Sequence, residues 1–121
     1  MLPDVKIIKL NGQGDVVKLL AKGQIVQCSN SLSDLMEEVL GPTGFSGPVL
    51  LSLADATFLD SAGVGWLLKC NKRFRDAGGS LVIHSIPPVV LDIMNVMRLS
   101  QVLKLCEDEE SALATIQGVK S

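Results

Sequence analysis

The stretch formed by residues 48–77 limits most strictly what this chain can fold into. It begins with a continuous apolar run at residues 48–53, which has the length and composition of a buried β-strand. It ends with an amphipathic run at residues 64–77, whose apolar side chains recur at helical spacing. Only a short segment separates the two runs, so the sequence predicts a buried strand, a turn and a helix in direct succession.

Two polar residues, Asp60 and Ser61, stand where the N-cap of this helix is expected, because their side-chain oxygens can accept hydrogen bonds from the first free backbone N–H groups. The small residues Ala62 and Gly63 keep the first helical turn nearly bare. A hydroxyl at this place lies near unsatisfied N–H groups and the positive end of the helix dipole. The position suits a phosphate, either bound or attached to Ser61, although helix capping alone explains the same residues.

The apolar run and the segment Phe-Leu-Asp-Ser-Ala-Gly-Val-Gly at residues 58–65 resemble the signature of the STAS domain. They are most similar to that of the bacterial anti-sigma factor antagonists, and the resemblance extends over residues 15–116. In that family the serine directly after the aspartate is phosphorylated. The resemblance therefore implies that Ser61 is a phosphorylation site, supported by Asp60, Ala62 and Gly63.

Membership of this family would imply a signalling protein that acts by partner switching. The unphosphorylated chain would bind an anti-sigma factor that is also a serine kinase, and the sigma factor would be released. Phosphorylation of Ser61 by that kinase would end the binding, and a PP2C-type phosphatase would restore it. The chain itself would then need no catalytic group and no cofactor.

One turn departs from the family pattern. Antagonists commonly carry Gly-Glu-Leu-Asp before their first helix, whereas this chain has Gly-Gln-Ile-Val at residues 23–26, so that Gln24 and Val26 replace the two acids. The change favours a divergent set of partners. It also leaves open a STAS adaptor subunit of a membrane transporter, such as a phospholipid-transport ABC system, or a nucleotide-sensing STAS module.

The helix after Ser61 predicts part of the surface that contacts the partner. At ~100° per residue, Trp66 points roughly 140° away from the side of Leu67 and Leu68, which we take as the core side. We therefore expect an exposed Trp66, unless it leans over a neighbouring helix or a dimer contact. The candidate partner-binding residues are Leu59, Val64, Trp66, Cys70, Gln24 and Val26.

The remaining chain alternates between patterns typical of strands and of helices. Strands are expected at residues 5–10, 16–20, 48–53, 80–86 and 102–106, and helices at residues 32–40, 64–77, 88–97 and 111–117. The first two strands predict a hairpin, and the later alternation predicts parallel pairing. We expect an α/β fold with one STAS-like domain over residues 1–121, in which about four helices cover a mixed sheet of four to five strands.

Other function classes fit the sequence less well. The nucleophile elbow of a hydrolase needs glycine where Leu59 stands, and the only histidine, His84, is expected inside a strand. Three separated cysteines without a Cys-x-x-Cys pair predict no metal site. A net charge of −2 and 3% aromatic residues argue against nucleic-acid binding. Without an apolar run of ~18 residues or a signal segment, we expect a cytoplasmic protein that does not insert into membranes.

Overall fold

The computed structural model describes residues 6–13, 16–25, 32–41 and 44–116. They form one five-stranded sheet in the order β1-β2-β3-β4-β5. The strands are β1 (Lys6–Gln13), β2 (Val16–Ile25), β3 (Pro48–Leu59), β4 (Ser80–His84) and β5 (Lys104–Cys106). The pair β1 and β2 is antiparallel and the other neighbours are parallel, so the predicted mixed sheet with an N-terminal hairpin is confirmed.

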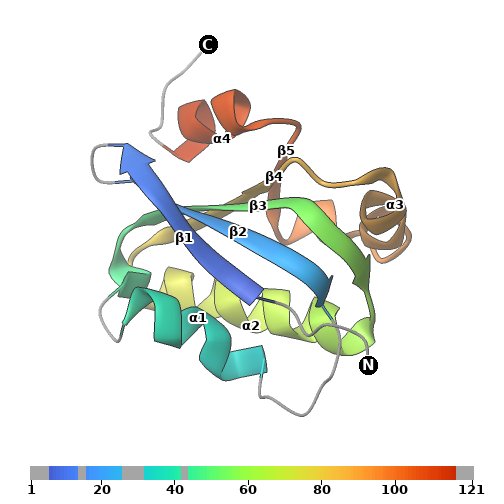
Figure 1. The fold of residues 1–121 in the computed structure, drawn as a ribbon, viewed down its shortest axis with the longest axis horizontal. Coiled ribbons are helices and arrows are strands. Elements are labelled where there is room, and N and C mark those ends of the chain that lie inside the picture. The colour runs from blue at the N-terminus through green and yellow to red at the C-terminus, as the bar shows by residue number, and fades with distance from the viewer. Residues whose placement is uncertain (1–5, 14–15, 26–31, 42–43, 117–121) are drawn as a thin grey trace.

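Four α-helices accompany the sheet in the described part of the chain: α1 (Leu32–Leu40), α2 (Ser61–Asp76), α3 (Pro88–Val96) and α4 (Glu109–Ile116). Two short 3-10 turns, Gly44–Ser46 and Leu99–Gln101, complete the regular structure. Figure 1 shows α1 and α2 on one face of the sheet, α4 on the opposite face, and α3 beside the far end of β3.

The two faces of the sheet bury two separate apolar clusters. The larger cluster includes Val49, Leu51 and Leu53 together with side chains of α1, α2 and α3. The smaller one places Leu50 against Ala112 of α4 and two neighbouring valines. Because helices cover β3 on both faces, residues 49–53 are buried without alternation, as expected for a central parallel strand.

The second half of β3 lies outside the predicted strand, which ended at Leu53. In this half the buried residues are Ala56 and Leu59, three apart, while the residues between them are exposed. Pairing with β2 explains the spacing, because the register shifts twice and each shift adds one residue to β3. These two β-bulges let the strand continue to Leu59 while keeping one face toward the core.

Neighbouring strands also differ in length from the prediction. The strand predicted at residues 16–20 is longer in the structure, because β2 runs through Gly23, whose positive φ of 96° suits glycine, to Ile25. In contrast, β4 ends at His84, which pairs with Ser52. Beyond Ser52, β3 therefore has no strand on its β4 side, and α3 lies there instead.

Candidate functional site

Ser61 is the first residue of α2 and its side chain is exposed. The preceding Asp60 is the N-cap, and its Oδ1 accepts a hydrogen bond of 2.8 Å from the backbone N–H of Gly63. Among the described residues, no partner binds the Ser61 hydroxyl. Its predicted place at an exposed helix N-terminus is confirmed, whereas its phosphorylation stays a prediction.

Gly63 holds the start of α2 against the end of β2. A Cβ atom at this position would overlap the carbonyl oxygen of Ile25 and approach Leu59 Cδ1 to 2.8 Å. The same carbonyl accepts a hydrogen bond from the Asp60 backbone N–H at 3.4 Å. Because Gly63 has no side chain, the start of α2 can approach the end of β2 closely, and Ser61 lies at the end of the sheet where β2 and β3 finish. Ala62, beside Ser61, is half-buried.

The prediction of an exposed Trp66 is wrong, because its side chain is only 3% exposed. The prediction placed residues around the helix at ~100° each and assumed that only one side of the helix faces the core. It counted Leu68 among the core-facing residues, but Leu68 is only half-buried. In the structure, α2 packs against the sheet on one side and α1 on another. The buried side of α2 is therefore wider than that of a helix that packs against a sheet alone. It includes both Trp66 and Cys70.

The Trp66 indole Nε1 is buried and, within the described part of the chain, has no hydrogen-bond partner. An unsatisfied buried donor costs about 1–3 kcal/mol. The burial agrees with the alternative that Trp66 packs against neighbouring structure, and it removes this side chain from the exposed surface.

Three further partner-binding candidates are buried as well. Leu59 is 1% exposed, and Val64 and Cys70 are each 3% exposed. Burial raises the pKa of the Cys70 thiol to about 12, although the nearby Arg73 guanidinium opposes the shift. These side chains belong to the main core cluster and are not part of the exposed surface, and their contact with a partner stays a prediction.

Of the two turn residues, Gln24 is half-buried and pairs with Phe58 in the β2–β3 register. It therefore lies close to the end of β3 that precedes Ser61. Val26 is outside the described residues.

Exposed apolar side chains that the sequence reading missed lie at the same end of the sheet. Phe58 is 42% exposed, and Val89 and Val96 of α3 are 59% and 83% exposed. Met97 lies in the helix predicted at residues 88–97, where its helical spacing from Val90 and Met94 favours a core position, but its side chain is 48% exposed. The exposure of Phe58 could not be predicted from the alternation of apolar residues, because the bulges of β3 change that alternation. The exposed valines of α3 could have been predicted, because this helix has more apolar residues than one buried face can hold.

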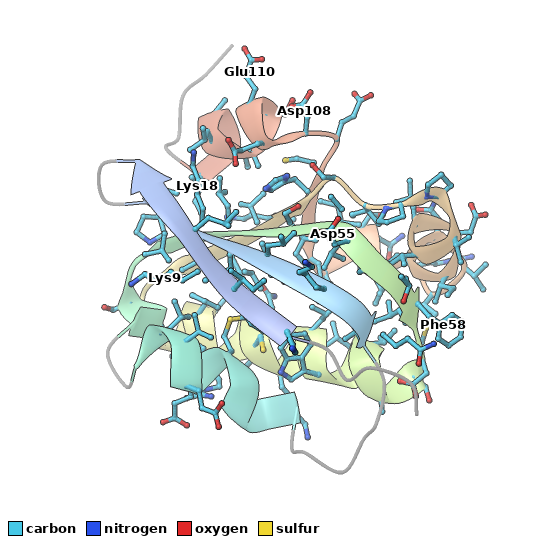
Figure 2. The ribbon with its side chains drawn as sticks, in the orientation of Figure 1. Lys9, Lys18, Asp55, Phe58, Asp108 and Glu110 are labelled. Atoms are coloured by element: carbon cyan, nitrogen blue, oxygen red, sulfur yellow. The ribbon has the colours of Figure 1, made fainter. Side chains whose placement is uncertain are left out.

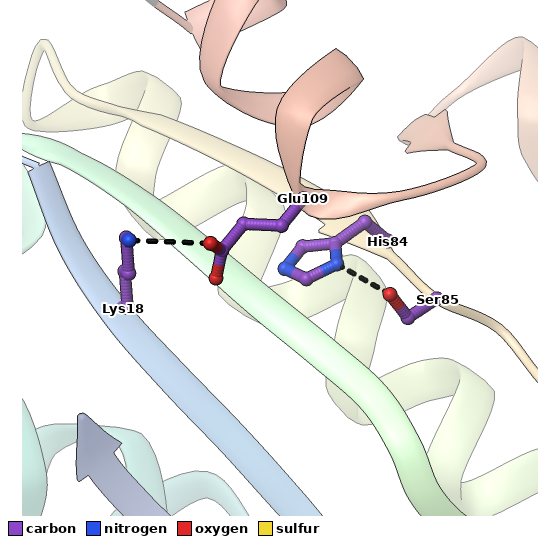
Figure 3. A network of polar contacts seen from close by, with 4 residues as sticks. All are labelled: Lys18, His84, Ser85 and Glu109. Carbon is purple, nitrogen blue, oxygen red and sulfur yellow. Dashed lines mark hydrogen bonds and ion pairs between the residues drawn. The ribbon is translucent and has the colours of Figure 1, made fainter.

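His84 is the last residue of β4 rather than an interior strand residue, and it is 4% exposed. Its Nδ1 lies 2.8 Å from the Ser85 hydroxyl, beside an ion pair of 3.2 Å between Lys18 and Glu109 (Figure 3). Burial lowers the pKa of His84, and the carboxylates of Glu109 and Asp108 oppose the shift.

The position of His84 argues against a serine hydrolase. His84 pairs with Ser52, and β3 continues for seven more residues before Ser61 follows. At a rise of ~3.3 Å per residue, the side chains of His84 and Ser61 are roughly 20 Å apart. A general base must lie within hydrogen-bond distance of the nucleophile. His84 therefore cannot activate Ser61 in this fold.

Among the described residues, no three His, Cys, Asp or Glu side chains gather in a metal-binding arrangement. None of the helices in the described ranges is both long enough and apolar enough to cross a membrane.

The fold and the site together define a small open α/β domain that presents a serine hydroxyl at the start of a helix. The family model of the STAS domain matches residues 6–112. The chain therefore belongs to the STAS domain family, which confirms the resemblance and the fold expected from the sequence.

Solved structures share this architecture over nearly the whole chain. An anti-sigma factor antagonist from Mycobacterium paratuberculosis superposes with a TM-score of 0.70 at 16% identity, covering 93% of this chain and 95% of that one. A putative antagonist from Thermotoga maritima gives 0.68 at 20% identity, with 96% and 94% covered. The unphosphorylated form of SpoIIAA, an anti-sigma factor antagonist, gives 0.68 at 15% identity, with 95% and 99% covered. At these identities the likeness shows the fold.

A curated relative is closer in sequence over a shorter stretch. The anti-sigma F factor antagonist of Paenibacillus polymyxa is 27% identical over 71 residues, which is 59% of this chain and 61% of that protein.

Proposed function

We propose that this chain is an anti-sigma factor antagonist that acts in the cytoplasm by partner switching through Ser61. The observation that carries the proposal is the exposed Ser61 hydroxyl at the first position of α2, directly after the capping Asp60. The name of the Paenibacillus polymyxa relative supports the same class. In this proposal the unphosphorylated chain binds an anti-sigma factor that is also a serine kinase.

The local electrostatics would allow phosphorylation to change binding without unfolding the chain. A phosphoserine adds up to about two negative charges. At the N-terminus of α2 the helix dipole favours an anion, so the fold tolerates the group. Against a docked partner and beside the Asp60 carboxylate, the same charge meets repulsion and a desolvation cost. Phosphorylation would release the partner, and a PP2C-type phosphatase would restore binding.

In this scheme the kinase activity belongs to the partner. The chain supplies a hydroxyl as the phosphate acceptor and a surface for docking, and it needs neither a catalytic group nor a cofactor.

The test is a titration of the purified anti-sigma factors of the source organism, one at a time, with wild type, Ser61→Ala and Ser61→Asp. One anti-sigma factor should bind the wild type and Ser61→Ala, and should bind Ser61→Asp at least about tenfold more weakly, which is about 1.4 kcal/mol. Ser46→Asp is the matched control, because Ser46 is exposed and precedes β3 at the opposite end of that strand. Equal affinity for Ser61→Asp and Ser46→Asp would refute the role of Ser61.

Phosphorylation itself is measured by intact mass. Incubation of the wild type with that anti-sigma factor and ATP should add one phosphate, and Ser61→Ala should remain unmodified. Addition of phosphate to both proteins would place the modification elsewhere.

A STAS adaptor subunit of a membrane transporter remains the second candidate. The observation that favours it is Gln24, an amide in place of the family acid, which pairs with Phe58 close to the candidate site. The ATPase subunit of a phospholipid-transport system should be included in the same titration, since binding to it and to no anti-sigma factor would support the adaptor.

A further inference from the structure

Helix α4 is held on the sheet by few apolar contacts. Ala112 is its one fully buried residue within the described range of the helix. It packs in the smaller apolar cluster with Val16, Leu50 and Val82, and two further apolar residues of α4 are only partly buried against that cluster. Regions with few buried apolar contacts open locally at a lower free-energy cost than the whole fold. We therefore expect α4 to leave the sheet more easily than α2, whose buried side chains belong to the main cluster.

Polar contacts at the start of α4 supply the rest of its attachment. The Lys18 ammonium of β2 and the Glu109 carboxylate form an ion pair of 3.2 Å, and the Lys18 side chain is only 16% exposed. Just before the helix, the Glu107 carbonyl oxygen accepts a hydrogen bond of 3.2 Å from the Ser85 backbone N–H. Figure 2 shows Lys18 on the side of the sheet that carries α4, and Glu110 pointing away from the sheet. The start of α4 is thus tied to β2 and to the residue that follows β4.

His84 lies under this first turn of α4. It is 4% exposed, and its ring lies between the Ser85 hydroxyl and Glu109 (Figure 3). On the sheet, its neighbour in β3 is Ser52, which does not titrate in the physiological range. The titratable groups that surround the ring are Lys18 from β2, Cys106 from β5, and Asp108 and Glu109 from the start of α4.

A proton on His84 is disfavoured while α4 covers the ring. Burial lowers the pKa of His84 and the Lys18 ammonium lowers it further, whereas the carboxylates of Glu109 and Asp108 oppose the shift without reversing it. If α4 left the sheet, water would reach the ring and the pKa would return towards 6.5, because burial is the largest cause of the shift. The open form therefore binds a proton more tightly than the closed form, so acidification favours opening.

We propose that His84 is a pH-sensitive latch for α4: protonation of its ring releases the helix from the sheet while the rest of the fold stays intact. The released form exposes Leu50 and Val82, which α4 otherwise covers. Helix α4 lies on the face of the sheet opposite α1 and α2 (Figure 1), so this inference does not depend on the proposed role of Ser61.

The release is measured by thiol labelling at two buried positions of one chain. In Cys28→Ser/Cys106→Ser/Val82→Cys, the introduced thiol replaces a valine that is 0% exposed under α4, whereas Cys70 is 3% exposed in the main cluster. Both thiols meet the same dithiodipyridine at the same pH, so the ratio of their labelling rates cancels the pH dependence of thiol chemistry. Global unfolding exposes both thiols together, whereas release of α4 exposes only position 82.

The rate at position 82 relative to Cys70 should rise several-fold between about pH 8 and about pH 5. The rise is limited to about thirtyfold by an open-state pKa of 6.5. In the same chain, His84→Gln and His84→Asn retain a polar side chain that cannot be protonated, so the ratio should stay constant. Glu110→Gln is the matched control, because Glu110 is an exposed acid of the same helix, and it should keep the rise.

Each contrary result overturns the latch. A ratio that does not change with pH would show that acid does not release α4 separately from the rest of the fold. A rise that persists in both histidine variants would assign the titration to another group. If the chain with Val82→Cys does not fold, amide hydrogen exchange of the wild type makes the same comparison. The protection of α4 amides relative to α2 amides should then fall with pH, and a constant relative protection would refute the release.

Discussion

Replacing Gly63 by alanine should move the start of α2, although alanine is the better helix former. The added Cβ would overlap the Ile25 carbonyl oxygen, and its other near neighbours are Leu59 Cδ1 at 2.8 Å and the Ile25 carbonyl carbon at 3.0 Å. Two of these three atoms are backbone, so a rotamer change cannot relieve the overlap. Either α2 shifts away from β2 or the end of β2 yields.

The magnitude follows from three terms. Overpacking a well-packed site costs about 1–3 kcal/mol. Displacing the Gly63 N–H from Asp60 Oδ1, now 2.8 Å away, removes a helix cap of about 1 kcal/mol. The higher helix propensity of alanine returns about 1 kcal/mol. We therefore expect Gly63→Ala to lower the free energy of unfolding by about 1–3 kcal/mol.

Urea unfolding followed by the emission of Trp66, the only tryptophan, measures this change. With a slope of about 2 kcal/mol per molar urea, the midpoint should fall by about 0.5–1.5 M. Gly65→Ala is the matched control, because it lies in the same helix and its Cβ would meet nothing within 4 Å. That variant should be more stable than wild type by about 0.5–1 kcal/mol. The same sign for both variants would refute the packing role of Gly63.

Three other outcomes follow from buried groups. Emission of Trp66 should be blue-shifted and resist quenching by iodide in the native chain, whereas red-shifted, quenchable emission would contradict its burial. In Cys28→Ser/Cys106→Ser, the remaining Cys70 should react with a thiol reagent only at the rate of unfolding, because it is buried and its pKa is raised to about 12. Since burial lowers the pKa of His84, the native state holds its proton less tightly than the unfolded chain, so stability should fall as pH decreases through 6.5 and below. His84→Gln should remove that part of the pH dependence, and an unchanged slope would contradict the assignment.

The strand–turn–helix unit around Ser61 could be predicted from sequence because its causes are local. An apolar run, a capping aspartate and two small residues act within a dozen positions of one another. The extension of β3 to Leu59 could not be predicted in the same way. It depends on two bulges, which arise only when β3 pairs with β2, a strand about thirty residues earlier.

Trp66 shows the same limit on a helix. The directions predicted for the α2 side chains around the helix axis were correct. Which of these directions is buried, however, depends on the elements that pack against α2. Besides the sheet, α2 packs against helix α1, which lies earlier in the chain, between β2 and β3. The sequence of α2 alone contains no information about the contact with α1, so the burial of Trp66 could not be predicted from it.

The local and the distant causes meet at Ser61. The capping Asp60 and the bare Gly63 determine that a hydroxyl stands at the start of α2, and both act through atoms within a few positions of it. What lies around that hydroxyl depends on strand lengths: β3 outruns β4, and α3 occupies the space beside it. Changes in the length of β4 or in the outer face of α3 would therefore alter the surroundings of Ser61 without altering its cap. Under the proposed function, such changes would let one STAS fold keep the same serine hydroxyl at the start of α2 while docking different partners.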